Sequence, residues 1–177
     1  MRAAMQAPAP EKPAQQAVQD GLPEPQRTRS MIVILLGIAV AVLDGTIVNL
    51  ALPGIAQELK ASPSAAIWVV NAYQIATLVM LLPLAALGDK VGYRRVYLVG
   101  MALFTVSSIV ATCANSLTML IVARALQGLG AAGIMSVNSA LVRLTYPAAE
   151  LGRNIAKNSV VVAASSVAGP SVAAAIL

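Results

Sequence analysis

Five stretches of mostly apolar residues follow one another along the chain, with short polar segments between them. Each has close to the number of residues, about 20, that a helix needs to cross a bilayer. Polar residues do not gather on one face of these stretches, which disfavours a soluble helical bundle. The pattern predicts an all-α integral membrane protein with helices at about 31–53, 66–87, 96–114, 117–141 and 155–177.

The first 30 residues differ from the rest, because they are rich in Pro, Ala, Gln and charge and show no apolar period. Such a composition cannot bury enough apolar surface to order the chain. We therefore expect a disordered leader at 1–30 and a membrane domain at 31–177. A cleavable secretory signal is disfavoured, since the first apolar stretch contains Asp44 and Asn49.

The composition supports a membrane location and argues against enzymes. The chain is 58% hydrophobic and 11% charged, whereas a soluble domain has about 25% charged residues. Histidine is absent and Cys113 is the single cysteine, so we expect no metal site, no internal disulfide and no nucleophile–base pair. The net charge of +5 does not indicate nucleic acid, because the basic residues lie between apolar stretches.

Lysine and arginine are distributed unequally between the two ends of the predicted helices. With the N-terminus in the cytoplasm, Lys60 alone falls outside and Arg124 lies within a helix. All the others fall inside, namely Arg2, Lys12, Arg27, Arg29, Lys90, Arg94, Arg95, Arg143, Arg153 and Lys157. Cytoplasmic segments carry an excess of Lys and Arg, so this bias predicts a multi-pass protein with a cytoplasmic N-terminus.

Two charged residues lie inside predicted helices, Asp44 in the first and Arg124 in the fourth. A charge in hydrocarbon is costly, so each should face water or a partner, and Asp44 could also be protonated. At about 1.5 Å per residue, Asp44 is about 14 Å and Arg124 about 10 Å from the outer ends of their helices. We expect the two to share one polar cavity, directly or through water. Asp44 could instead be a structural acid that fixes helix packing.

Other polar residues accompany this pair. Asn71 and Gln74 share one face of the second helix. We expect these side chains to line a substrate cavity, although hydrogen bonds between helices explain them as well. The candidate cavity residues are Thr46, Asn49, Asn71, Gln74 and Gln127.

The charged segment 88–95 joins the second and third helices. Gly88 and Gly92 permit a tight turn, and Asp89 can sit at a helix terminus and bond free amides. The segment could also serve only to set topology. In the fifth helix, Gly169-Pro170 interrupts the hydrogen-bond ladder and should kink or soften the helix, unless it is merely a tolerated membrane proline.

These motifs together resemble the major facilitator superfamily and, within it, the drug:proton antiporter branch with fourteen helices. Four regions carry the resemblance: the run Leu43–Pro53 in the first helix, the segment after the second, the start of the fourth, and Gly169-Pro170. The middle two match at Leu87, Asp89, Lys90, Gly92, Arg94 and Arg95, and at Arg124, Gln127, Gly128, Gly130, Ala131 and Ala132.

The resemblance implies roles for these residues. Asp44 and Arg124 would couple protons, the segment with Asp89, Lys90, Gly92, Arg94 and Arg95 would gate the cytoplasmic side, and Gly169 and Pro170 would mark the antiporter helix. The energy source would be a proton gradient without a cofactor. The substrate would be a small amphipathic compound, and the location an inner or plasma membrane.

The resemblance also implies that the chain holds the first five helices of a longer transporter, an N-terminal fragment that lacks its C-terminal helices. Three alternatives stay open. The chain could be a five-helix membrane protein that acts by helix association, an inactive truncated product, or part of an exporter of a sugar or other metabolite.

Overall fold

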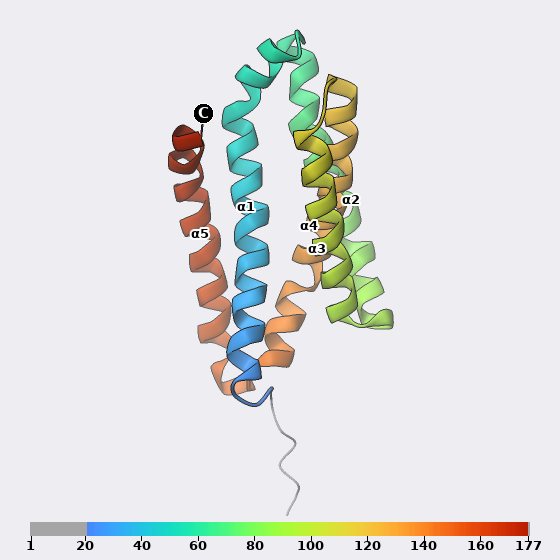
Figure 1. Cartoon of the computed structure of the whole chain (residues 1–177). Coiled ribbons are helices and arrows are strands. Elements are labelled where there is room, and N and C mark those ends of the chain that lie inside the picture. The colour runs from blue at the N-terminus through green and yellow to red at the C-terminus, as the bar shows by residue number, and fades with distance from the viewer. Residues whose placement is uncertain (1–20, 177) are drawn as a thin grey trace, which may run out of the picture.

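The computed structural model describes residues 21–176, and side chains as far as Ala174. This part of the chain is helical and contains no strand, which confirms the all-α class. Five long helices lie side by side in a bundle (Figure 1). Their bounds are α1 Gln26–Glu58, α2 Pro63–Val91, α3 Tyr93–Thr112, α4 Leu117–Thr145 and α5 Leu151–Ile176, with a short 3-10 turn at Ala148–Glu150.

The predicted disordered leader is wrong for its last ten residues, whereas residues 1–20 lie outside the described part. Helix α1 already begins at Gln26. The Leu22 amide donates to the Thr145 carbonyl at 3.0 Å, and the Arg27 guanidinium lies 5.6 Å from the centre of the Tyr146 ring. Backbone bonds and a cation–π contact order this segment, and neither depends on the apolar content from which disorder was inferred.

Four helices of the described part, α1 to α4, are long and apolar enough to cross a membrane. Helix α5 has 26 residues, but its apolar end runs past the last described side chain. The fifth predicted span therefore stays a prediction. A multi-pass membrane protein follows from the other four.

The predicted loop at 88–95 is much shorter than expected. Helix α2 runs to Val91 and α3 begins at Tyr93, so Gly92 alone joins them, at φ +97°. Only glycine adopts this conformation readily. Charged side chains at a membrane surface stay hydrated without interrupting the helix, which is why charge alone overestimated the length of the loop.

Helix α4 is the centre of the bundle. It packs along α2 on one side and α3 on the other, while α5 packs mainly on α1. Glycines allow the close approaches, because a Cβ on Gly130 would meet the backbone of Phe104, and one on Gly100 the backbone of Gly130. The main buried cluster consists of Ala41, Tyr73, Val96, Tyr97, Phe104, Ala131, Ile134 and Val137.

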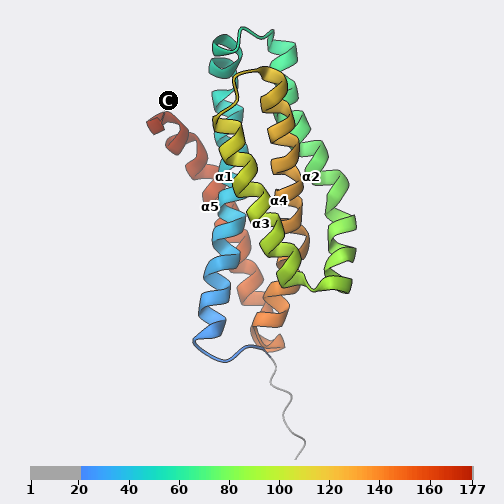
Figure 2. The same ribbon diagram turned by 45° about the vertical axis from the view of Figure 1, so that its right-hand side comes forward.

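Helix α5 approaches α1 closely where Gly169 meets Thr46. A Cβ added to Gly169 would collide with the Thr46 side chain, at 2.5 Å from its methyl carbon. The helix continues through Pro170. Beyond this contact, Figure 2 shows the last turns of α5 lying away from the rest of the bundle. Gly169, one of the two predicted antiporter residues, thus contacts α1 two residues from Asp44.

Candidate functional site between α1, α2 and α4

Three polar side chains form a closed triangle between α1 and α4. Nη1 of Arg124 donates a hydrogen bond to Oδ2 of Asp44 at 2.6 Å. The same nitrogen donates to Oε1 of Gln127 at 2.6 Å. The amide nitrogen of Gln127 in turn donates to Oδ1 of Asp44 at 2.9 Å. Each oxygen of the carboxylate therefore has its own donor.

A fourth residue, Tyr73 of α2, closes the site from the other side of Arg124. The guanidinium carbon lies 4.4 Å from the centre of the Tyr73 ring, well within the range of a cation–π contact. The Tyr73 hydroxyl donates to the Ala41 carbonyl of α1 at 3.4 Å. The ring thus stacks on the arginine while its hydroxyl ties α2 to α1.

The exposure of the ion pair is unequal. The Arg124 side chain is 3% exposed, whereas that of Asp44 is 19% exposed. A buried charge needs a partner and further hydrogen bonds to offset its lost hydration, and Arg124 has both. Asp44 is the member of the pair that solvent or a ligand can reach.

Local helix geometry explains how these groups meet. Arg124 and Gln127 are three residues apart on α4 and therefore lie on one face. Helix α2 comes close because Gly128 has no side chain: a Cβ there would collide with the Tyr73 carbonyl. The Thr77 hydroxyl fills this contact and donates to the Gly128 carbonyl at 3.1 Å.

The predicted proximity of Asp44 and Arg124 is confirmed, and the contact is direct. Of the other candidate cavity residues, Gln127 joins the triangle. The Thr46 hydroxyl donates to the Val42 carbonyl, and the Asn49 amide donates to the Gly45 carbonyl. On α2, Asn71 is half-buried and Gln74 is exposed. Their role in a substrate cavity stays a prediction.

Sequence reasoning did not assign Tyr73 and Thr77 to the site. Both were visible as polar residues of the second helix, one turn apart. The face that carries Asn71 and Gln74 was favoured because these two amides lie three residues apart on the helix. The structure turns the Tyr73 and Thr77 face toward α4 instead, and both residues are buried.

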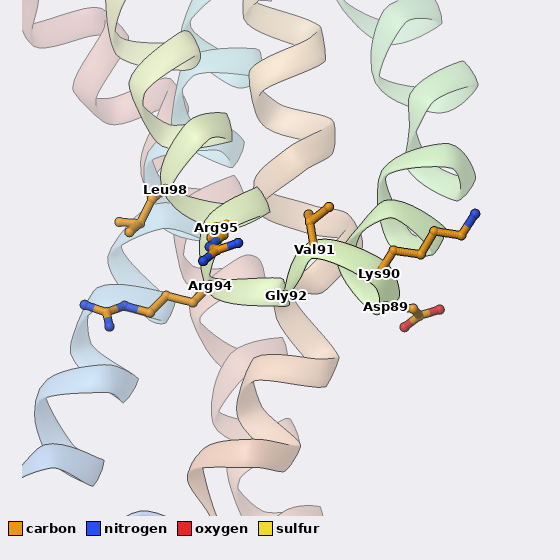
Figure 3. A pocket seen from close by; sticks show the side chains of 7 residues that line it. All are labelled: Asp89, Lys90, Val91, Gly92, Arg94, Arg95 and Leu98. Atoms are coloured by element: carbon orange, nitrogen blue, oxygen red, sulfur yellow. The ribbon is translucent and has the colours of Figure 1, made fainter.

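The charged turn between α2 and α3 lies at the end of the bundle where α1 begins (Figure 1). It borders a surface hollow of about 700 Å³ lined by Asp89, Lys90, Val91, Gly92, Arg94, Arg95 and Leu98. In Figure 3, Arg94 points away from Asp89. We call this end, where the turn and Arg143 and Arg153 lie, the basic end.

Asp89 is bonded differently from the prediction. It sits in the last turn of α2, where its carboxylate accepts the Tyr93 hydroxyl at 2.6 Å. A helix C-terminus offers free carbonyls rather than free amides, so the predicted bonds to backbone amides have no donors at the end of α2. The contact with Tyr93 instead links the two helices across Gly92.

Comparisons with known proteins agree with this architecture. The family model described as Major Facilitator Superfamily matches residues 34–177. An uncharacterized transporter of Escherichia coli, YebQ, is 54% identical over 89% of this chain and 35% of its own length. The riboflavin transporter RibZ of Clostridioides difficile is 36% identical over 83% of this chain and 32% of its own length.

A third relative is the tetracenomycin C resistance and export protein of Streptomyces glaucescens, 38% identical over 80% of this chain and 26% of its own length. The chain thus spans about a third or less of the length of these curated relatives.

Proposed function

Because this chain belongs to the major facilitator superfamily of membrane transporters, we propose that it provides the proton-coupling helices of an exporter for small amphipathic, drug-like compounds. The observation that carries the proposal is the triangle of Asp44, Arg124 and Gln127. Its ion pair is more buried than Arg153–Glu150, the other ion pair of the described residues. The acid of the triangle, Asp44, is partly accessible.

The chemistry of the triangle fits a proton switch. While Asp44 is ionised, it holds Arg124 and Gln127 through one hydrogen bond to each oxygen. A proton on the carboxylate would remove the charge attraction and turn one oxygen into a donor, which faces a donor on either neighbour. Protonation would therefore loosen α1 from α4. Arg124 keeps its proton and acts as the fixed charge.

Neighbouring features support a transport cycle around this switch. The contact of Gly169 with Thr46 lies half a turn from Asp44, so a shift of α1 would be felt by the antiporter helix. We propose that the charged turn with Asp89, Lys90 and Arg94 gates the far end of the same helices. The energy source would be the proton gradient, with no cofactor.

Alternating access needs two halves that rock against each other. We propose that further helices of a longer protein supply the second half and much of the substrate cavity. We also place the chain in the inner or plasma membrane with its basic end in the cytoplasm, in accordance with the excess of basic residues there.

The substrate class is supported by the relatives, one of which is a tetracenomycin C resistance and export protein. A second candidate, a metabolite transporter, is favoured by the similarity to a riboflavin transporter. Uptake or export of labelled riboflavin and of a cationic dye by the same preparation separates the two. The compound that is moved against its own concentration gradient identifies the class, and the other compound should inhibit that transport only if both share one site.

Proton coupling can be tested with Asp44→Asn in the full-length protein reconstituted in liposomes. We expect the variant to lose substrate accumulation driven by a pH gradient, because Asn keeps the shape but carries no titratable proton. Exchange of substrate without a gradient should persist. The matched control is Glu58→Gln, which removes an exposed acid of the same helix. Gradient-driven transport by Asp44→Asn at the control's rate would refute the proposal.

A further inference from the structure

Buried polar atoms without a protein partner are concentrated on two helices. Within the described residues they are Nε of Arg124 and the amide oxygens of Asn138, Asn154 and Asn158. Asn138 is 4% exposed and Asn154 is 0% exposed. Nearly all buried polar groups in folded proteins are hydrogen-bonded to protein or to ordered water. These atoms therefore need water molecules as hydrogen-bond partners.

The positions of these residues along the helices form a line. On α4, Asn138 lies fourteen residues after Arg124, which is close to four full turns, so both lie on nearly the same face. On α5, Asn154, Asn158 and Ser165 are spaced by four and seven residues and also share a face. Ser165 is buried as well, at 7% exposure.

The heights of these residues match between the two helices. Helix α4 ends at Thr145 and α5 begins at Leu151, both at the basic end. Asn138 and Asn158 each lie seven residues from these termini, which places both at about 10 Å from that end at about 1.5 Å per residue. Asn154 lies nearer to the surface, at about 5 Å, and Ser165 deeper, at about 21 Å. Helix α5 contacts α4 but packs mainly on α1.

The line ends beside the candidate functional site. Gly169 follows Ser165 by one turn and touches Thr46, two residues from Asp44. Asn154, Asn158, Ser165 and Gly169 thus mark one face of α5 from the basic end to the level of the ion pair, with Val161 and Val162 between Asn158 and Ser165. Water that satisfied the three asparagine oxygens would lie on the path from that end to Asp44.

We propose that Asn138, Asn154, Asn158 and Ser165 line a narrow water-filled passage between α5 and the helices α4 and α1 that connects the basic end with the Asp44–Arg124–Gln127 triangle. Its ligand is water, held by about three hydrogen bonds per buried molecule. As a route for protons to Asp44 it rests on the proposed function, but the presence of water along it does not.

The test is cysteine accessibility in the full-length protein, in a background free of reactive cysteines that includes Cys113→Ser. Asn158→Cys and Ser165→Cys probe the lower and upper passage. The matched controls are Val160→Cys and Val167→Cys, two residues further along α5 in each case, at side chains that are 65% and 78% exposed on the bundle surface. In a membrane this surface faces lipid or other helices.

The reagent is a small cationic methanethiosulfonate, added from the side of the basic end. It reacts with the thiolate, which forms only in contact with water. We expect both passage cysteines to react at least tenfold faster than their controls. Rates within twofold of the controls would overturn the passage, and so would reaction at Asn158→Cys without reaction at Ser165→Cys.

Two additions keep the test decisive. Asn138→Cys probes the same height from α4 if Asn158→Cys does not fold, as judged by size-exclusion chromatography. The labelling is repeated in Asp44→Asn. If gradient-driven transport is unaffected by Asp44→Asn while the passage cysteines still react, the proposed function fails and the passage stands. If transport needs Asp44 but the cysteines stay unreactive, the passage fails alone.

Discussion

The guanidinium of Arg124 lies over the ring of Tyr73, with its central carbon 4.4 Å from the ring centre. This contact joins α2 to a charge on α4 whose counter-ion comes from α1. Three helices therefore meet at one arginine, and changes at any of them should be felt by the other two.

Tyr73→Phe should leave stability and transport close to those of the unmodified protein, whereas Tyr73→Ala should not. Phenylalanine keeps the cation–π contact, worth about 2 kcal/mol when desolvated, and loses only the long hydrogen bond to Ala41. Thermal unfolding of the detergent-solubilised full-length protein measures the difference. Equal losses for the two variants would show that the hydroxyl, not the ring, holds the site.

Arg124→Gln should be strongly destabilising, by about 3–5 kcal/mol, because it leaves the Asp44 carboxylate without its counter-ion. Adding Asp44→Asn should recover part of that loss, since the double variant buries no charge. A double-mutant cycle measured by chemical unfolding should give a coupling energy of about 0.5–3 kcal/mol. Additive losses would argue that the two charges do not interact in the membrane.

Gly128→Ala should destabilise the bundle by about 1–3 kcal/mol, the usual cost of overpacking. The new Cβ would collide with the Tyr73 carbonyl, and a backbone atom cannot move aside as a flexible side chain can. Gly45→Ala in α1 is the matched control, because nothing lies within 4 Å of a Cβ there. It should be neutral or stabilising, by up to about 1 kcal/mol. Thermal unfolding of both variants provides the comparison.

Gly92→Ala should weaken the turn between α2 and α3 by about 1–3 kcal/mol through backbone strain alone. A Cβ at Gly92 would meet no atom within 4 Å, yet its φ is +97°. We expect faster proteolysis at the turn and a lower melting temperature. A variant at Gly54, which is also uncrowded but helical, controls for the loss of a glycine. If the two alanine variants melt together, the turn carries no strain.

Some features of the site could be predicted from residue types and their spacing along the chain. Asp44 and Arg124 are charged residues in apolar stretches, so their need for each other follows from the cost of an unpaired charge in a membrane. Their similar depth follows from helix rise alone. Gln127 could be added because three residues along a helix return to the same face.

Other features could not be predicted from spacing along the chain. Tyr73 was not placed against Arg124, and the disorder expected up to Ser30 was wrong because contacts with Thr145 and Tyr146 order that segment. Asp89 was expected to bond backbone amides and instead accepts a hydroxyl from Tyr93. Each of these depends on a partner brought near by packing or by a turn of one residue.

The sequence by itself determined that this protein is a bundle of membrane helices, which end carries the basic residues, and that an acid and an arginine within the helices lie at similar depths. The length of each apolar stretch and the positions of charged residues decide these properties, and both can be read from the sequence without knowledge of packing. The tertiary structure decided that α4 is central, that α5 lies on α1, and that Tyr73 faces Arg124. Helices that are apolar all round carry no signal for which face turns inward, so small residues such as Gly128 and the backbones they admit settle the rotation of each helix.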